Sequence, residues 1–319
     1  SSQEISDAGT WQQRAAQEER TFQPSTRVDV GELNDGQRTV YDAVMDHAHR
    51  RVREVVQPLH AMVCGTAGSG KTFLIRAIKQ ELGNACLVLA PTGVAADNIG
   101  GRTYQSVVPM PRKDIDREDI IPKDKKRIER VVAELDGVSY IVIDEMSMVG
   151  RRSLGQVDAL LQHATGCKQL FGGLSVILVG DHGQLPPVKD RRCFDWAGVR
   201  HTTQKLFKRV LTTAPKWQRL GVDAYEAFTT VFFLDRIERI AQSDDAGESQ
   251  LLERFRSLQL RARDGELTET DYAFMKEHMS LEGRETQFAG PDTYRLVPTQ
   301  AARDEKNNAA FEAALERNI

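Results

Sequence analysis

The chain has 319 residues, of which 40% are hydrophobic and 28% charged, and its formal net charge is −3. This is the composition of an ordinary globular protein with room for about two domains. No apolar stretch approaches the roughly 20 residues that a membrane-spanning helix needs, and the first residues lack the basic start and apolar core of a secretion signal. We therefore expect an intracellular protein without a membrane partner. The small net charge does not exclude nucleic-acid binding, because a local basic channel is enough for it.

Residues 1–29 are polar with few bulky apolar groups, which favours a flexible lead-in. A helix is expected after Leu33, since Asn34 or Asp35 can cap it and apolar residues recur behind them at helical spacing. Gln37 would lie in the first turn of this helix. Its amide either faces solvent or reads the edge of an adenine base, and the motif alone leaves both interpretations open.

An apolar run at residues 59–64 leads directly into a glycine-rich loop and a helical pattern. The loop matches the phosphate-binding P-loop at every fixed position, and its residues are Gly65, Thr66, Ala67, Gly68, Ser69, Gly70, Lys71 and Thr72. Between a strand and a helix, the backbone N–H groups of such a loop and the positive end of the helix converge on phosphate oxygens. We expect Lys71 to reach the β and γ phosphates and Thr72 to offer its hydroxyl to Mg²⁺.

A second apolar run, at residues 85–90, is typical of a parallel strand that is buried on both faces. It ends in Pro91 and Thr92, at the place where α/β folds put ligand-contacting loops. Residues 95–106 supply small side chains and hydroxyls of the kind that hold a sugar-phosphate backbone, although a plain loop has the same composition. Residues 112–130 alternate acids and bases, which indicates either a solvated face or a small inserted domain.

The third apolar run, at residues 139–143, ends in the carboxylates Asp144 and Glu145. In P-loop enzymes, the first acid of such a pair completes the Mg²⁺ site, and a neighbouring glutamate can polarise the attacking water. We assign the Mg²⁺ role to Asp144 and the general-base role to Glu145. A fourth run, at residues 174–179, leads to Gln184, which would touch the γ-phosphate from the carboxyl end of a strand.

Taken in order, these motifs resemble those of superfamily 1 DNA helicases, and the chain is similar to the Pif (petite integration frequency) family. The family signature is matched by residues 157–161 and 171–176, a stretch that related RecD-type helicases lack. The resemblance covers residues 33–315. It implies an enzyme that hydrolyses ATP to move along single-stranded DNA in the 5′ to 3′ direction and to unwind duplex or structured DNA. It also implies a part in genome maintenance: DNA repair, recombination and telomere maintenance.

The resemblance assigns roles to single residues as well. It implies that Gln37 reads adenine. The family positions that grip single-stranded DNA are matched by Pro91, Thr92, Thr103 and Ser106. Gln105 departs from the family, which commonly has His there. Arg239 falls where the family directs an arginine at the γ-phosphate, but Ile240 follows it in place of the family's Gln. The implied cofactors are ATP and Mg²⁺, and the implied partners are single-stranded DNA, DNA junctions and other structured DNA.

We therefore predict an α/β fold: a P-loop NTPase whose first RecA-like motor domain, a parallel sheet, spans residues 30–215, with a small insertion at about 109–136. An incomplete second RecA-like domain is expected in residues 220–319, with the aromatic cluster at 228–233 as its first core strand. The later helicase motifs would lie beyond Ile319 or not exist. Because the chain does not begin with Met and stops inside a helical pattern, we expect a piece of a longer polypeptide.

Two other functions stay open. One is a truncated, non-translocating remnant of such a helicase, for example one derived from a mobile element, which binds nucleotide without turnover. The other is a P-loop enzyme of different chemistry, such as a small-molecule kinase, against which Gln184 and the family signature argue. With Arg239 as its only arginine for the γ-phosphate, the chain alone is expected to bind ATP, to hydrolyse it poorly and not to unwind DNA. The expected location is the nucleus or mitochondrion of a eukaryote, or the cytoplasm if the source is bacterial or viral.

Overall fold

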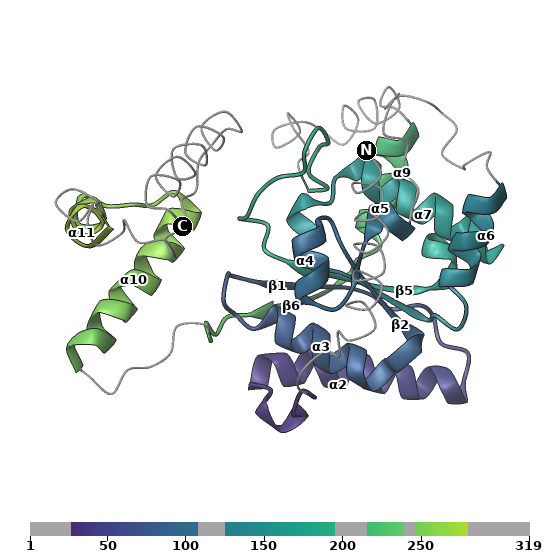
Figure 1. The fold of residues 1–319 in the computed structure, drawn as a ribbon, viewed down its shortest axis with the longest axis horizontal. Coiled ribbons are helices and arrows are strands. Elements are labelled where there is room, and N and C mark those ends of the chain that lie inside the picture. The colour runs from purple at the N-terminus through teal and green to yellow at the C-terminus, as the bar shows by residue number, and fades with distance from the viewer. Residues whose placement is uncertain (1–26, 108–124, 195–215, 239–245, 280–319) are drawn as a thin grey trace, which may run out of the picture. The chain divides into compact units, whose positions relative to one another are not determined.

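The computed structural model describes residues 27–107, 125–194, 216–238 and 246–279. The chain divides into two compact units, residues 1–252 and 253–319. The first unit contains a six-stranded parallel sheet with helices on both faces (Figure 1). This confirms the predicted α/β fold and its parallel sheet.

The sheet has the strand order β3-β2-β4-β5-β1-β6, and each neighbouring pair of strands is parallel. Its strands are β1 (His60–Gly65), β2 (Cys86–Ala90), β3 (Arg102–Thr103), β4 (Tyr140–Ile143), β5 (Ser175–Gly180) and β6 (Thr230–Leu234). The four apolar runs of the sequence become β1, β2, β4 and β5. Such runs are expected of parallel strands, because helices cover both of their faces.

Helices α2 and α3 pack on one face of the sheet, and α5, α6, α7 and α9 pack on the other (Figure 1). The described helices are α2 (Asp35–Arg53), α3 (Lys71–Leu82), α4 (Gly93–Asn98), α5 (Tyr104–Val107), α6 (Lys125–Glu134), α7 (Arg151–Thr165), α9 (Lys216–Glu226), α10 (Ala246–Asp264) and α11 (Glu269–Met279). Short 3-10 turns occur at η1 (Val30–Glu32), η2 (Gly83–Ala85), η3 (Met146–Met148) and η4 (Leu170–Gly173). None of the helices in the described ranges is long and apolar enough to cross a membrane.

Helix α2 begins with a capping box formed by Asn34 and Gln37. Asn34 Oδ1 accepts the Gln37 N–H at 2.9 Å, and Gln37 Oε1 accepts the Asn34 N–H at 3.0 Å. This reciprocal pair satisfies N–H groups that the first turn of a helix leaves without a partner. Of the two predicted caps, Asn34 is therefore the one used. Gln37 is only 2% exposed, so the interpretation that its amide faces solvent is wrong.

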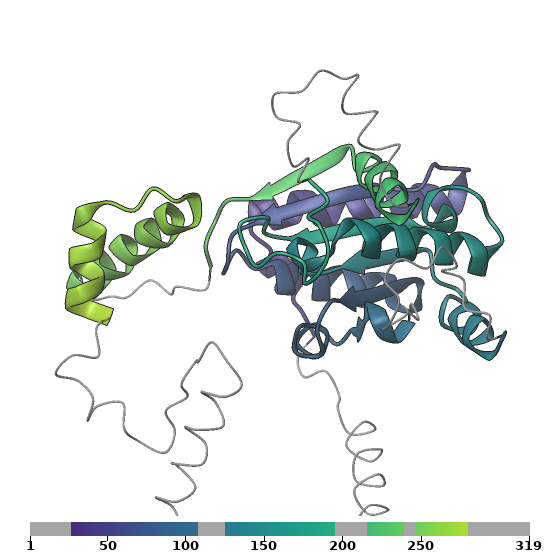
Figure 2. The same cartoon turned by 90° about the horizontal axis from the view of Figure 1, so that it is seen from above.

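The strand that was predicted to begin a second sheet joins the first one instead. β6 pairs in parallel with β1, with Leu234 opposite Gly65, and the two strands lie side by side in Figure 2. Phe232 and Leu234 pack into the hydrophobic cluster beneath α2 and α3. The first compact unit, which contains β6, extends to Leu252. The apolar pattern of a strand indicates that it is buried, but it does not indicate which sheet edge supplies its hydrogen bonds.

Helix α6 begins within residues 112–130, the stretch in which acids and bases alternate, and continues to Glu134. Val131 on the helix and Leu135 just after it are buried in the same hydrophobic cluster as α7, while Glu129 and Arg130 are exposed. One face of this helix therefore packs against the core of the first unit. The predicted insertion at 109–136 is described only from residue 125 onward, because residues 108–124 lie outside the described ranges.

The last two described helices, α10 and α11, form a connected pair. The Arg261 guanidinium donates to both carboxylate oxygens of Asp271, with Nε 2.8 Å from Oδ2. Asp271 also accepts the backbone N–H of Thr268 at 3.0 Å and thereby helps to cap α11. Residues 251–258 form part of α10. A second RecA-like domain stays a prediction, since residues 280–319 lie outside the described part of the chain.

Candidate active site

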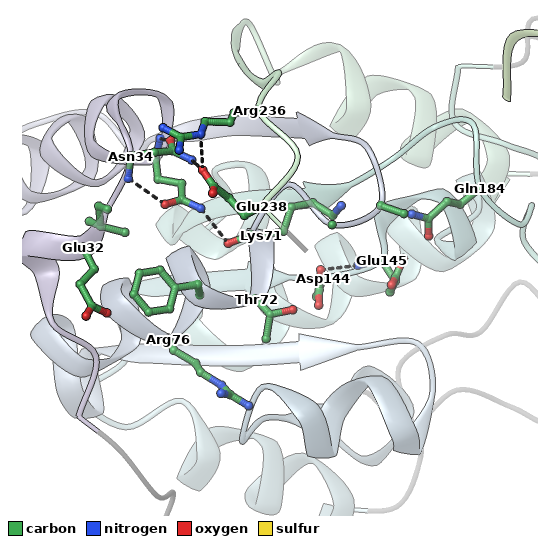
Figure 3. A pocket seen from close by; sticks show the side chains of 16 residues that line it. Glu32, Asn34, Lys71, Thr72, Arg76, Asp144, Glu145, Gln184, Arg236 and Glu238 are labelled. Atoms are coloured by element: carbon green, nitrogen blue, oxygen red, sulfur yellow. Dashed lines mark hydrogen bonds and ion pairs between the residues drawn. The ribbon is translucent and has the colours of Figure 1, made fainter. Parts of the chain in front are cut away.

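The carboxyl ends of β1, β4, β5 and β6 open onto a pocket of about 950 Å³ (Figure 3). In open α/β sheets, ligands bind in the crevice at this edge of the strands. Nine of the predicted site residues line this pocket: Gln37, Ala67, Gly68, Gly70, Lys71, Thr72, Asp144, Glu145 and Gln184. They come from helix α2, the P-loop, the end of β4 and the loop after β5, which are far apart in the sequence.

The P-loop connects β1 to α3, as the motif predicts. Gly70 is in the left-handed conformation, with φ of 79°, immediately before α3 begins at Lys71. The Lys71 side chain is buried, and its Nζ donates to the backbone oxygens of Gly65 and Thr66, each at 2.8 Å. The ammonium group therefore lies within the curve of the loop. Together with the N–H groups at the start of α3, this makes a positively polarised cradle of the kind that binds phosphate.

Asp144 and Glu145 follow β4 and point into the same pocket. Asp144 is 6% exposed, and its Oδ1 accepts the Glu145 N–H at 2.9 Å. Burial raises the pKa of Asp144 to about 6, against the lowering effects of this hydrogen bond and of the Lys71 charge. Glu145 has a left-handed backbone, with φ of 51°. A non-glycine residue in this region costs about 1–3 kcal/mol and is found mainly at functional sites.

A divalent cation fits the oxygen donors on this side of the pocket. The Thr72 hydroxyl and the Asp144 carboxylate line one wall. Mg²⁺ prefers oxygen ligands and commonly takes only one or two from the protein, the others coming from water and substrate phosphates. Burial disfavours the charged form of the Asp144 carboxylate. A bound cation would favour that form by placing positive charge beside it.

A second cavity of about 320 Å³ adjoins the pocket. It shares four lining residues with the pocket, namely Thr72, Asp144, Glu145 and Gln184. Its opposite wall belongs to α4 and includes Thr92, whose hydroxyl caps that helix by accepting the Ala95 N–H at 3.2 Å. The four shared residues therefore border both cavities.

The four residues predicted to grip DNA lie at the carboxyl ends of the neighbouring strands β2 and β3. Thr103 on β3 is in register with Ala90, the last residue of β2. Ser106 Oγ donates to the Thr103 backbone oxygen at 2.7 Å. Gln105, which departs from the family pattern, donates through Nε2 to the Pro91 backbone oxygen at 3.3 Å. Gln105 thus connects the two loops that carry these residues, which the sequence could not indicate.

The pocket is also lined by Arg236 and Glu238, for which no role in the site was predicted from the sequence. The Glu238 N–H donates to the Gly68 backbone oxygen at 2.7 Å, and Glu238 Oε1 accepts from Asn34 Nδ2 at 2.8 Å. Arg236 Nε lies 2.9 Å from the same oxygen. The only signal for them was their position just before Arg239. Arg239 itself lies outside the described residues, so the structure does not place its predicted contact with the γ-phosphate.

Comparison with known proteins identifies similar sequences. Residues 32–273 match the family model of the PIF1-like helicases. The chain is 38% identical over 138 residues to the ATP-dependent DNA helicase Pif1 of Bdellovibrio bacteriovorus, a match that covers 43% of this chain and 31% of that protein. It is 32% identical over 161 residues to the ATP-dependent DNA helicase PIF5 of Trypanosoma brucei brucei, covering 49% of this chain and 17% of that protein. The matched region thus spans less than a third of these curated relatives.

Solved structures show the same fold. The Pif1 helicase from Bacteroides in complex with ADP-AlF3 and single-stranded DNA superposes with a TM-score of 0.61 at 23% identity, covering 87% of this chain and 56% of that one. The Pif1 helicase from Candida albicans gives a TM-score of 0.57 at 19% identity, covering 87% of this chain and 54% of that one. At these identities the likeness concerns the fold, and the family match rests on the sequence.

Proposed function

This chain belongs to the PIF1-like helicase family, and we propose that it forms the ATP-binding motor part of an ATP-dependent DNA helicase. The observation that carries the proposal is the convergence of the P-loop, the acidic pair and Gln184 on one pocket of about 950 Å³. Phosphoryl transfer needs chiefly positioning and electrostatic stabilisation, and these groups supply both. Four residues of these groups, Thr72, Asp144, Glu145 and Gln184, also line the neighbouring cavity.

In this proposal, the N–H groups of the P-loop hold the triphosphate. Lys71 exchanges its contacts with the backbone oxygens of Gly65 and Thr66 for contacts with the β and γ phosphates. Thr72 and Asp144 hold Mg²⁺, which neutralises charge on the phosphates when it is bound. The buried amide of Gln37 lies beside the loop, with Nε2 3.3 Å from the Ser69 backbone oxygen, and we assign to it the recognition of adenine.

Glu145 acts on the attacking water as general base. Its strained backbone holds the carboxylate where the two cavities meet. Gln184, which also borders both cavities, contacts the γ-phosphate and senses its loss. Arg239 completes the charge stabilisation of the transition state, a role that arginines in P-loop enzymes perform with an effect of about 10³ to 10⁵ on rate.

The DNA partner is assigned to the carboxyl ends of β2 and β3, next to the smaller cavity. Pro91, Thr92, Thr103 and Ser106 offer hydroxyl and backbone groups there, which suit the sugar-phosphate backbone. A Pif1 structure from Bacteroides was determined with bound single-stranded DNA, and another Pif1 structure concerns DNA unwinding at forked duplex DNA. We propose the same partners for the intact protein, with 5′ to 3′ movement and a part in repair, recombination and telomere maintenance. Such a protein would act inside the cell, where its DNA is.

The test is ATP binding and DNA-stimulated hydrolysis by the 319-residue chain. Lys71→Ala removes the charge partner of the phosphates and should abolish ATP binding measured by calorimetry. Lys79→Ala is the matched control, since it removes the same charge from the same helix at a residue that contacts the Gly100 backbone oxygen and does not line the pocket. Equal ATP affinity of Lys71→Ala and the parent chain would refute the proposal.

Glu145→Gln separates binding from chemistry. It keeps the shape of the side chain and removes the base, so ATP binding should persist while hydrolysis falls by about 10²-fold or more. Turnover at the parental rate by Glu145→Gln would assign the base to another group.

A further inference from the structure

Glu238 places a carboxylate in the wall of the pocket. None of the steps proposed above for phosphate binding or hydrolysis uses this carboxylate. Its backbone is attached to the P-loop through the hydrogen bond to the Gly68 oxygen. A Cβ built on Gly70 would lie 3.9 Å from Glu238 Cγ and 2.1 Å from Gln37 Nε2. Glu238 therefore lies beside both the phosphate loop and the amide that we assign to the base.

Two neighbours hold the side chain of Glu238 in one orientation. Asn34 Nδ2 donates to Oε1 at 2.8 Å, and Arg236 Nε forms an ion pair with the same oxygen at 2.9 Å (Figure 3). Within the described part of the chain, no residue donates a hydrogen bond to Oε2. The side chain is 37% exposed and lines the pocket. Glu238 thus presents a fixed acceptor oxygen to whatever fills this part of the pocket.

In a nucleotide bound as proposed above, the ribose would lie near the place where Gln37 meets the P-loop, with its Nε2 3.3 Å from the Ser69 oxygen. In a nucleotide the ribose joins the base to the phosphates, so a base at Gln37 and phosphates at the start of α3 leave the ribose beside Gly70 and Glu238. Ribose carries two adjacent hydroxyl donors. A carboxylate is a suitable acceptor for them, and dinucleotide-binding folds use Asp or Glu for this purpose. The ion pair with Arg236 offsets the negative charge of Glu238 near the triphosphate.

We propose that Glu238 accepts hydrogen bonds from the ribose hydroxyls and makes the pocket select ribonucleotides over their deoxy analogues. This inference rests on the proposed nucleotide-binding function. It assigns specificity to a residue that belongs to none of the motifs of the P-loop or the acidic pair.

The test compares dissociation constants for ATP and 2′,3′-dideoxyATP, measured by calorimetry on the 319-residue chain in Mg²⁺. A hydrogen bond to a charged acceptor corresponds to about a 10-fold change in affinity, so the parent should bind ATP at least about 10-fold more tightly. Glu238→Ala should bring the ratio of the two constants close to one, and Glu238→Gln, which keeps an acceptor oxygen, should give an intermediate ratio. Glu32→Ala removes another carboxylate from the same pocket and should leave the ratio unchanged.

The outcomes separate the two proposals. If the parent binds neither nucleotide, the nucleotide-binding function is wrong and this inference falls with it. If the parent binds both equally well, or if Glu238→Ala weakens both to the same extent, the pocket binds nucleotide without selection by Glu238 and the inference alone is overturned. A retained parental ratio in Glu238→Ala would overturn it in the same way.

Discussion

Helix α7, which follows the acidic pair, is capped by a residue from a distant loop. Its N-cap residue, Gly150, has no side chain. Asp190 takes over this function: Oδ1 accepts the Arg152 N–H at 3.2 Å, and Oδ2 accepts the Ser153 N–H at 3.0 Å. A Cβ at Gly150 would lie 2.1 Å from Asp190 Cγ, so the carboxylate can approach only because this residue is glycine. We predict that Asp190→Ala destabilises the first unit.

The magnitude follows from these contacts. Loss of an N-cap side chain costs about 0.5–2 kcal/mol, and loss of an anion at the positive end of a helix costs about 0.3–1 kcal/mol more. We therefore expect Asp190→Ala to reduce the free energy of unfolding by about 2 kcal/mol, which for a unit of this size lowers Tm by about 4–8 °C. Asp190→Asn keeps an acceptor oxygen and loses the charge, so it should cost about half as much.

Thermal and urea denaturation followed by circular dichroism measure this effect. Asp46→Ala is the control, because Asp46 is an exposed acid on α2 and its replacement should change stability by no more than about 0.5 kcal/mol. The capping argument is refuted if Asp190→Ala unfolds with the parental free energy. It is also refuted if Asp190→Asn proves more destabilising than Asp190→Ala.

The remaining predictions concern three other regions. Gly172→Ala should destabilise more than Gly166→Ala in the same denaturation assay: both glycines have positive φ, but a Cβ at Gly172 would lie 2.6 Å from a backbone oxygen of α7, whereas one at Gly166 would meet nothing within 4 Å. Hydrogen bonds from Arg261 hold the pKa of Asp271 below its usual range. The contribution of Asp271 to stability is therefore complete above about pH 4 and is lost as pH falls through the pKa of the folded state. Asp271→Asn should make stability depend less on pH in the acid range. Single-stranded DNA binding should weaken with salt, with a slope of about −0.7 for each phosphate neutralised. Thr92→Ala should reduce this binding more than Thr92→Ser, which keeps the hydroxyl, and equal affinities would remove Thr92 from the DNA site.

The site elements that could be predicted from the sequence are those whose geometry depends on consecutive residues. Eight neighbouring residues, Gly65 to Thr72, contain the glycines, the lysine and the hydroxyl of the P-loop. The apolar runs before them and before Asp144 indicate buried parallel strands, and parallel strands bring their carboxyl ends to the same edge of a sheet. The meeting of the P-loop, the acidic pair and Gln184 could be foreseen for that reason, as could the α/β fold.

Tertiary structure decided the features that join residues far apart in the chain. β6 could have begun a new sheet. Instead it forms its hydrogen bonds with the edge strand β1, and its apolar side chains are buried in the layer under α2. Asp190 caps α7 through Ser153, 37 residues earlier in the chain. Glu238 contacts Gly68 and also Asn34, from which it is separated by 204 residues. Side-chain chemistry alone shows that each of these carboxylates can accept hydrogen bonds. Only the folded chain determines which donors lie within reach, because that depends on packing of the whole sheet rather than on local sequence.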